Sequence, residues 1–321
     1  MTHLRLAPLG LVPLAAALAC GGGGKSGQAP APAAAAPAAA PTRLVLHDVR
    51  VRGTDLRFVE RGTGIPVVFV HGSLGTLESW GPQIEAFATR FRVIAYSRRY
   101  HWPNAAQPDG QEYTLSLHAD DLIGLIEALG LERVHLVGSS YGAYVALLVT
   151  LRRPDLVRSL VLAEPPILPW LGRTPAGDSL LHTFDRTVFK AARAAFVRDD
   201  SVGAVQRFWD GLAGATSPFD ALPEGARARL LRSVFELRLE TRADPADYMP
   251  ALACKDIGGI RSPVLLVTGE RSPRMFHVIS EELARCLAAE ETVTVPGAGH
   301  GVNADNAGFY NGAVLQFLMK N

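Results

Sequence analysis

Short apolar runs, separated by stretches with helical spacing, constrain the fold of this chain more than any other feature. The runs are PVVFV (66–70), VHLVG (134–138), SLVLA (159–163) and PVLLVTG (263–269). A continuous apolar run of this kind is typical of a strand that is buried on both faces of a sheet. Strands that alternate with helices predict an α/β fold with a mostly parallel, doubly wound sheet.

The composition supports a sizeable core and argues against some classes of partner. The chain has 321 residues, of which 48% are hydrophobic and 20% are charged. A net charge of +1 gives no support to a nucleic acid partner, because such proteins carry a clear basic excess. The cysteines show neither CxxC spacing nor a zinc-ligand cluster with histidines, so we predict no metal site.

Residues 167–255 interrupt the alternation of strands and helices. Their apolar residues recur at helical spacing in two stripes, which are Leu181, Phe184, Val188, Ala191 and Ala195, and Leu230, Val234 and Leu237. An insertion of about ninety residues between two strands predicts a helical cap over the strand ends instead of a loop. The α/β core would then comprise residues 43–166 and 256–321.

Residues 1–20 have the pattern of an export signal. Arg5 precedes an apolar segment that is too short to span a bilayer comfortably. The segment ends in Ala17-Leu18-Ala19-Cys20, which looks like a bacterial lipobox, so we favour lipidation of Cys20 over cleavage to a soluble secreted protein. Residues 21–42 are rich in Ala, Pro and Gly and predict a linker.

This amino-terminal pattern predicts a protein that is exported from a bacterial cytoplasm. With a lipid on Cys20, it would be anchored to a membrane and face the periplasm or the exterior; otherwise it would be secreted. Outside the cytoplasm a disulfide between Cys254 and Cys286 is allowed, although their spacing does not say whether they pair.

A G-x-S-x-G pattern follows one of the apolar runs and precedes a helical segment. It reads Gly138-Ser139-Ser140-Tyr141-Gly142. Between a strand and a helix, this pattern is typical of a tight turn that presents a nucleophilic serine, here Ser140. A serine hydroxyl is a weak nucleophile at neutral pH and needs a general base. His300 in GAGHG (297–301), after the last predicted strand, is the best candidate for that base.

With HGSLG (71–75) after an earlier strand, these motifs resemble the α/β-hydrolase fold family, in the family's order and over residues 43–321. The resemblance implies an oxyanion hole, a pair of N–H groups that bind the negative charge of the reacting oxygen. One donor would be the backbone N–H of Ser73, or alternatively of Leu74, and the other that of Tyr141. The resemblance requires no cofactor, and His71 is expected to shape the loop.

The third catalytic residue departs from the family pattern. Members of the family usually read G-E-x-D after the penultimate strand, whereas this chain reads Gly269-Glu270-Arg271-Ser272. Ser272 cannot carry the negative charge that stabilises an imidazolium. We favour Glu164, at the end of the strand that follows the nucleophile strand, because some haloalkane dehalogenases of the family use a glutamate there. Glu270 is the alternative acid.

The segment YSRRYHWPN (96–104) departs from the family as well, since relatives often read close to D-x-R-G-x-G. Two interpretations stay open. Arg98 or Arg99 could bind an anionic substrate, or the segment could brace the cap.

The motifs together predict a serine hydrolase that acts on a small carboxylic ester or lactone through an acyl-enzyme. A C–C bond hydrolase would use the same three residues but needs a polar pocket, which Arg98 or Arg99 could supply. A cofactor-free haloperoxidase-like enzyme is also compatible with the motifs. The missing aspartate leaves a non-catalytic ligand-binding protein on the same fold as a further hypothesis.

Overall fold

The computed structural model describes residues 45–105, 112–214, 217–288 and 290–321. The predicted signal segment, the linker and Cys20 lie outside the described residues. Within the described residues, no helix combines the length and apolar character needed to cross a membrane.

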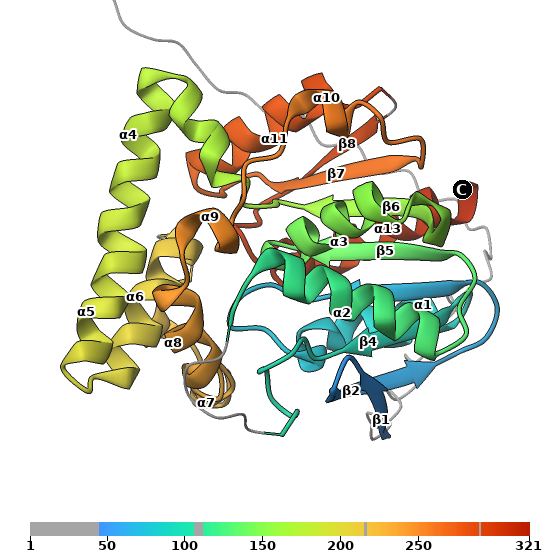
Figure 1. Ribbon diagram of the computed structural model, residues 1–321, viewed down its shortest axis with the longest axis horizontal. Coiled ribbons are helices and arrows are strands. Elements are labelled where there is room, and N and C mark those ends of the chain that lie inside the picture. Colours follow the sequence, from blue (N-terminus) through green and yellow to red (C-terminus); the bar gives the residue numbers. More distant parts are fainter. Residues whose placement is uncertain (1–44, 106–111, 215–216, 289) are drawn as a thin grey trace, which may run out of the picture. The chain divides into compact units, whose positions relative to one another are not determined.

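One eight-stranded sheet forms the centre of the described chain, with the strand order β1-β2-β4-β3-β5-β6-β7-β8 (Figure 1). The strands are β1 (Leu46–Val51), β2 (Thr54–Arg61), β3 (Pro66–Val70), β4 (Arg92–Tyr96), β5 (Val134–Ser139), β6 (Val157–Ala163), β7 (Val264–Gly269) and β8 (Glu290–Val295). β2 runs antiparallel to β1 and β4, and all the other pairs are parallel. The predicted fold class is confirmed.

Helices cover both faces of the sheet because alternate strand residues point to opposite sides. Outside the segment between β6 and β7, they are η1 (Leu77–Trp80), α1 (Gly81–Ala88), α2 (Leu115–Ala128), α3 (Tyr141–Arg152), η2 (Pro154–Leu156), α11 (Arg274–Cys286), α12 (Val302–Asp305) and α13 (Ala307–Lys320). Val68 and Val70 pack in the apolar cluster that contains α2 and α3. Val67 and Phe69 pack in the cluster that contains α1 and α13.

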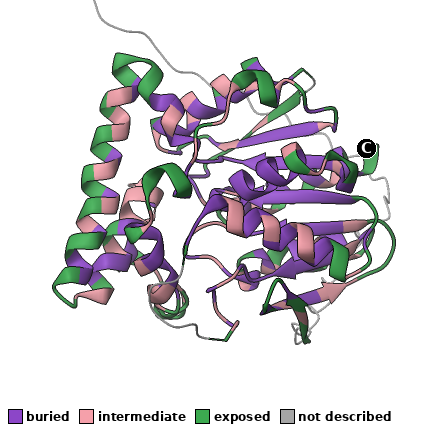
Figure 2. Ribbon diagram, viewed as in Figure 1, coloured by how far each residue is buried: buried purple, intermediate pink, exposed green. Residues whose placement is uncertain are grey.

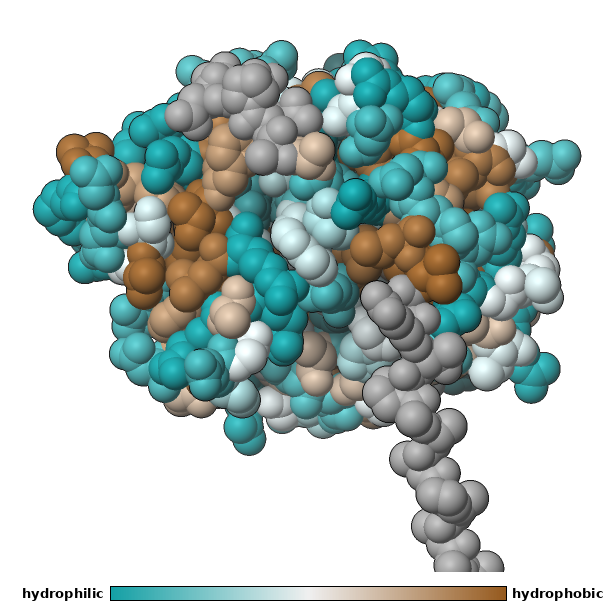
Figure 3. All heavy atoms as spheres, turned by 90° about the horizontal axis from the view of Figure 1, so that it is seen from below, coloured by the Kyte–Doolittle hydropathy of each residue, from teal (hydrophilic) through white to brown (hydrophobic). Residues whose placement is uncertain are grey.

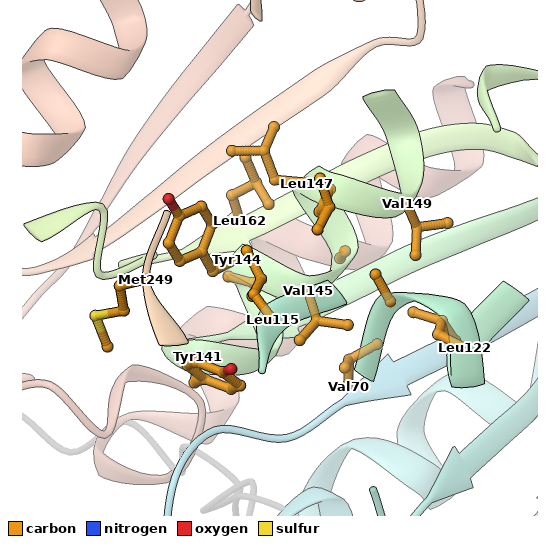
Figure 4. Close-up of a cluster of buried hydrophobic side chains, with 14 of the residues drawn as sticks. Val70, Leu115, Leu122, Tyr141, Tyr144, Val145, Leu147, Val149, Leu162 and Met249 are labelled. Carbon is orange, nitrogen blue, oxygen red and sulfur yellow. The ribbon is translucent and has the colours of Figure 1, made fainter. Parts of the chain in front are cut away.

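Helix α3, which begins directly after Ser140, is held by apolar contacts on several sides. In Figure 4, Val145 and Val149 of this helix lie near Val70 of β3 and Leu122 of α2. Burying side chains of this size stabilises the fold by about 1.5–3 kcal/mol each. The start of α3 is therefore fixed relative to the sheet.

The segment between β6 and β7 is helical, as the sequence predicts. It contains η3 (Leu168–Arg173), α4 (Pro175–Phe184), η4 (Asp185–Phe189), α5 (Lys190–Val197), α6 (Ser201–Ala213), η6 (Phe219–Ala221), α7 (Glu224–Leu231), α8 (Val234–Arg242), α9 (Pro245–Tyr248) and α10 (Cys254–Ile257). We call these helices the cap. Figure 1 shows α4, α5, α6 and α8 gathered at the left of the view.

The cap packs through the predicted apolar stripes. Phe184, Val188 and Ala195 of the first stripe and Leu237 of the second are buried. Figure 2 shows exposed and buried residues alternating along α4 and α5, as expected of helices that are covered on one side.

The face of the molecule drawn in Figure 3 is largely hydrophilic, with separate apolar areas.

A disulfide joins Cys254 and Cys286, a pairing that the sequence left open. It connects α10, the last helix of the cap, to the end of α11 in the core.

Candidate active site

Ser140 lies in a sharp turn between β5 and α3. Its φ of 52° and ψ of −125° are unfavourable for a residue with a side chain, so the surrounding packing has to hold it. Two glycines make the turn possible. A Cβ on Gly142 would lie 2.1 Å from the carbonyl oxygen of Val70, and one on Gly138 would lie 2.5 Å from the Cα of Ala143. Glycine is therefore required on both sides of Ser140.

His300 comes to the same place from the loop between β8 and α12. Its Nε2 lies 2.9 Å from Ser140 Oγ, within hydrogen-bond reach. Phe276 of α11 stacks flat against the imidazole, with the ring centroids 3.9 Å apart and the planes at 12°. The hydrogen bond and the stacking together restrict the orientation of the ring.

Glu164 occupies the other side of His300. Its Oε2 lies 2.6 Å from His300 Nδ1, and its Oε1 accepts a hydrogen bond of 2.7 Å from the backbone N–H of Gly269. The side chain is 0% exposed, and the residue has a positive φ of 50° at the end of β6. Both carboxylate oxygens are therefore engaged, which fixes Glu164 relative to His300.

The alternative acid lies elsewhere. Glu270 is exposed, and its Oε2 accepts a hydrogen bond of 2.7 Å from the N–H of Gly297 in the turn after β8. Ser272, at the position where the family usually has its aspartate, is buried, and its Oγ has no partner among the described residues. The structure thus brings Glu164, and not Glu270, to His300.

The loop of residues 71–75, which we call the oxyanion loop, lies directly against Ser140. A Cβ on Gly72 would be only 2.9 Å from Ser140 Cβ. The backbone N–H groups of Ser73, Leu74 and Tyr141 donate to no acceptor in the part of the chain that the structure describes. Tyr141 is the first residue of α3, where the helix dipole favours negative charge.

Arg98 braces the oxyanion loop from the core. Its buried guanidinium donates to the carbonyl oxygens of His71 (3.0 Å) and Gly72 (3.1 Å), and to the hydroxyl of Tyr113 (3.2 Å). Arg99 pairs with Asp121, with a shortest distance of 2.6 Å between the two groups. Neither guanidinium lines the pocket at Ser140, which argues against substrate binding. Both bond within the core, and it is Trp102 of the same segment that contacts the cap, beneath the guanidinium of Arg232.

His71 belongs to the same brace. Its Nε2 accepts from the backbone N–H of Arg98 at 2.9 Å, so Nδ1 carries the proton and donates to Gly72 O. Burial and the nearby Arg98 charge lower the pKa of His71 well below its ordinary value. His71 therefore shapes the loop as a neutral imidazole.

Two carboxyl groups from α8, neither of them predicted from the sequence, are buried beside the oxyanion loop. Ser73 Oγ donates to Glu240 Oε1 at 2.5 Å, and the hydroxyl of Tyr248 donates to the same oxygen. Glu236, one turn earlier, is 0% exposed. Burial raises the pKa of Glu240 and raises that of Glu236 well above its ordinary value.

A pocket of about 360 Å³ opens at Ser140, between the core and the cap. The core side is formed by the oxyanion loop, Ser140 and His300. The cap side is formed by apolar residues and two arginines: Trp209, Leu212, Leu222, Leu230, Arg229 and Arg232. None of these cap residues was predicted to line the site, because their position depends on how the cap helices pack. Across the described residues, no cluster of three or more metal-ligating side chains is present.

Known proteins resemble this chain in sequence. A family model described as alpha/beta hydrolase fold matches residues 65–307. A 2-(acetamidomethylene)succinate hydrolase from Mesorhizobium japonicum is 28% identical over 270 residues, covering 81% of this chain and 90% of that protein. An sn-1-specific diacylglycerol lipase from Mus musculus is 29% identical over 262 residues, covering 78% of this chain and 80% of that protein.

Solved structures show the same fold. The carboxylesterase CesB from Bacillus subtilis has a TM-score of 0.68 and 20% sequence identity, covering 88% of this chain and 93% of that chain. The family model spans most of the sheet and the whole cap, from β3 to the start of α13. The chain therefore belongs to the α/β-hydrolase fold family and is a hydrolase.

Proposed function

We propose that this protein is a serine hydrolase that cleaves a small carboxylic ester or lactone through an acyl-enzyme intermediate. The observation that carries the proposal is the continuous chain of contacts from Ser140 Oγ to His300 Nε2 (2.9 Å) and from His300 Nδ1 to Glu164 Oε2 (2.6 Å). A nucleophile, a base and an acid in this order can activate a serine hydroxyl.

In the first half of the reaction, Ser140 Oγ attacks the substrate carbonyl while its proton moves to His300 Nε2. Glu164 stabilises the imidazolium that forms. The backbone N–H groups of Ser73 and Tyr141 bind the developing oxyanion, an interaction that typically contributes several kcal/mol. The intermediate collapses, His300 gives the proton to the leaving alkoxide, and the acyl group stays on Ser140.

In the second half, His300 removes a proton from a water molecule, which attacks the acyl carbonyl. The same N–H groups bind the second oxyanion. Collapse of this intermediate releases the carboxylic acid and returns the proton from His300 to Ser140.

The pocket supports a small substrate with apolar character. Its volume of about 360 Å³ lies at the lower end of the usual range for ligand sites, and the cap contributes Trp209 and Leu230 to the wall. The C–C bond hydrolase alternative relied on Arg98 or Arg99, and both are engaged within the protein. The alignment of Ser140, His300 and Glu164 argues against a non-catalytic binding protein. The haloperoxidase-like alternative calls for an assay of halide-dependent oxidation.

The test is labelling of the full chain with a fluorophosphonate probe, together with hydrolysis of p-nitrophenyl acetate. We expect wild-type protein to be labelled and to hydrolyse the ester, and Ser140→Ala to do neither. Folded wild-type protein that is neither labelled nor active would refute the proposal.

We also propose that the protein is exported and lipid-anchored through Cys20. The signal-like pattern of residues 1–20 supports this location, and so does the Cys254–Cys286 disulfide, since disulfides persist mainly outside the cytoplasm. Expression in a bacterial host, followed by membrane fractionation and mass spectrometry, tests it. A lipid adduct that is lost in Cys20→Ala is expected, and protein retained in the cytoplasm would contradict the proposal.

A further inference from the structure

We propose that Glu240, on cap helix α8, is a positioning residue that holds the oxyanion loop in its catalytic geometry through the hydroxyl of Ser73. Packing of the cap and assembly of the oxyanion hole would then be coupled. This inference rests on the proposed function, because it assigns a role in the same site.

Side chains on α8 and just before it contact two residues of the oxyanion loop, Ser73 and Leu74, directly, and reach Gly75 through His101. Glu240 Oε1 accepts from Ser73 Oγ at 2.5 Å, and the hydroxyl of Ser233 donates to the carbonyl oxygen of Leu74 at 3.1 Å. Glu236 Oε1 lies 3.4 Å from His101 Nδ1, which is itself 2.8 Å from the carbonyl oxygen of Gly75.

The spacing along α8 explains why these side chains act together. Ser233 directly precedes the helix, and Glu236 and Glu240 follow at intervals of three and four residues, which places them on one side of a helix. All three residues are at most 1% exposed. Polar side chains buried this deeply are kept where they have partners. The oxyanion loop supplies partners to Ser233 and to Glu240 Oε1, whereas neither oxygen of Glu236 has a hydrogen-bond partner among the described residues.

The oxyanion loop depends on such contacts because its own conformation is unfavourable. Leu74 has a φ of 57°, in the left-handed region that residues with side chains rarely adopt. Arg98 holds the carbonyl groups of His71 and Gly72 from the core. The second half of the loop, from Ser73 to Gly75, is held by α8 and by His101. Without Glu240, the hydroxyl of Ser73 would lose its hydrogen-bond acceptor, and the backbone N–H of Ser73, a proposed oxyanion donor, would be held less firmly.

The contact does not depend on a charge on Glu240. Oε1 accepts both hydrogen bonds, from Ser73 and from Tyr248, and Oε2 has no partner among the described residues. A glutamine could therefore present its carbonyl oxygen in the place of Oε1. An alanine would remove the acceptor and leave both hydroxyl groups without it.

The experiment is a double-mutant cycle on Glu240→Ala and Ser73→Ala in the full chain, with p-nitrophenyl acetate as the probe. We expect each single variant to lower kcat by about 10- to 100-fold, because displaced oxyanion donors stabilise the transition state less. KM should change by less than about threefold, and the double variant should be no slower than the slower single one. Fluorophosphonate labelling should slow in parallel.

Two further variants separate positioning from general stability. Glu240→Gln should keep kcat within about threefold of wild type. Thr241→Val changes a buried neighbour on α8, and it should leave kcat unchanged. Among the described residues, the Thr241 hydroxyl bonds only to Arg238 O of the same helix. If Glu240→Ala does not fold, Ser73→Ala remains as a test, because it still has to lower kcat. Its effect on kcat should be the same in the Glu240→Gln variant as in the wild type.

An active wild type whose kcat is unaffected by Glu240→Ala or by Ser73→Ala would overturn the inference and leave the proposed function standing. Effects of the two variants that multiply in the double variant would also overturn it, because independent effects exclude a shared contact. An unlabelled, inactive wild type would overturn the proposed function and this inference together.

Discussion

The carboxylate of Glu164 bonds to the backbone of Gly269, so that the end of β6 is joined to the end of β7 in front of His300. Glu164 Oε1 accepts a hydrogen bond of 2.7 Å from the backbone N–H of Gly269, and Glu164 Oε2 lies 2.6 Å from His300 Nδ1. Gly269 is the residue at which the family's usual acid turn begins. The proposed acid, Glu164, therefore lies at the end of the neighbouring strand but is oriented by the backbone of the strand that usually supplies the acid in this family.

The first prediction concerns this acid. Glu164→Gln should lower kcat for p-nitrophenyl acetate by about 10³- to 10⁴-fold, because a neutral amide does not stabilise the imidazolium and can favour the wrong tautomer of His300. Glu270→Gln is the control and should stay within about twofold, since Glu270 bonds to Gly297 instead. A larger loss in Glu270→Gln than in Glu164→Gln would reverse the assignment.

The second prediction moves the acid to the position usual in the family. Ser272 is buried, and its Oγ, which has no partner within the described part of the chain, lies 2.8 Å from where a Cβ on Gly269 would be. We expect Ser272→Asp, added to Glu164→Ala, to raise kcat at least about tenfold over Glu164→Ala alone, because a nearby carboxylate can again stabilise the imidazolium. Steady-state kinetics of the single and double variants measure the gain. No gain would show that an aspartate at position 272 does not reach His300.

The third prediction concerns pH and stability. Burial raises the pKa of Glu236 well above its ordinary value; the negative charge of Glu240 adds to this increase and the positive charge of Arg98 reduces it. Burial lowers the pKa of the neighbouring His101, which is therefore neutral. The contribution of Glu236 to the free energy of unfolding is therefore fully present below the pKa of the carboxyl group in the unfolded chain. It is lost as the pH rises through the pKa of this group in the folded protein.

Glu236→Gln removes this ionisation. Its free energy of unfolding relative to wild type should increase between pH 5 and pH 8, by about 1.4 kcal/mol for each pH unit in which only the folded state holds the proton. Urea denaturation at the two pH values tests the sign. A difference that is the same at both values would mean that Glu236 ionises alike in the folded and unfolded chains.

The fourth prediction concerns the disulfide. Replacing Cys254 and Cys286 together with serine should lower the free energy of unfolding by about 3–4 kcal/mol, since the closed loop has a sequence separation of 32 residues. Denaturation of wild-type protein with and without a reductant provides the matched comparison. A double variant as stable as the oxidised wild type would contradict the prediction.

Much of the site could be predicted because it depends on local patterns at strand ends. Ser140 and His300 lie in glycine-flanked turns directly after strands, and Glu164 ends the strand next to that of the nucleophile. The carboxyl ends of neighbouring parallel strands meet at one edge of a sheet. The order of the motifs along the chain, together with the strand order that the family resemblance implies, was therefore enough to predict these residues at one site.

The contacts between the cap and the core could not be predicted in the same way. Glu240 lies 167 residues after Ser73 in the sequence. No local sequence pattern predicts which face of a cap helix will contact which loop of the core. The spacing of Ser233, Glu236 and Glu240 on one side of α8, next to the buried Leu237, was the available signal. The role of Arg98 was left open for a similar reason, since its partners His71 and Gly72 lie in another loop.

The position of Glu164 has a consequence for recombining this protein with its relatives. Only Pro165, Pro166 and Ile167 separate the acid from η3, so Ser140 and Glu164 both precede the cap and His300 follows it. A foreign cap joined after Pro166 would inherit all three residues intact. It would also arrive without Ser233 and Glu240. Such a chimera would keep the acid and base groups of the site, but its kcat would be lower unless the new cap supplied equivalent hydrogen-bond partners to the oxyanion loop.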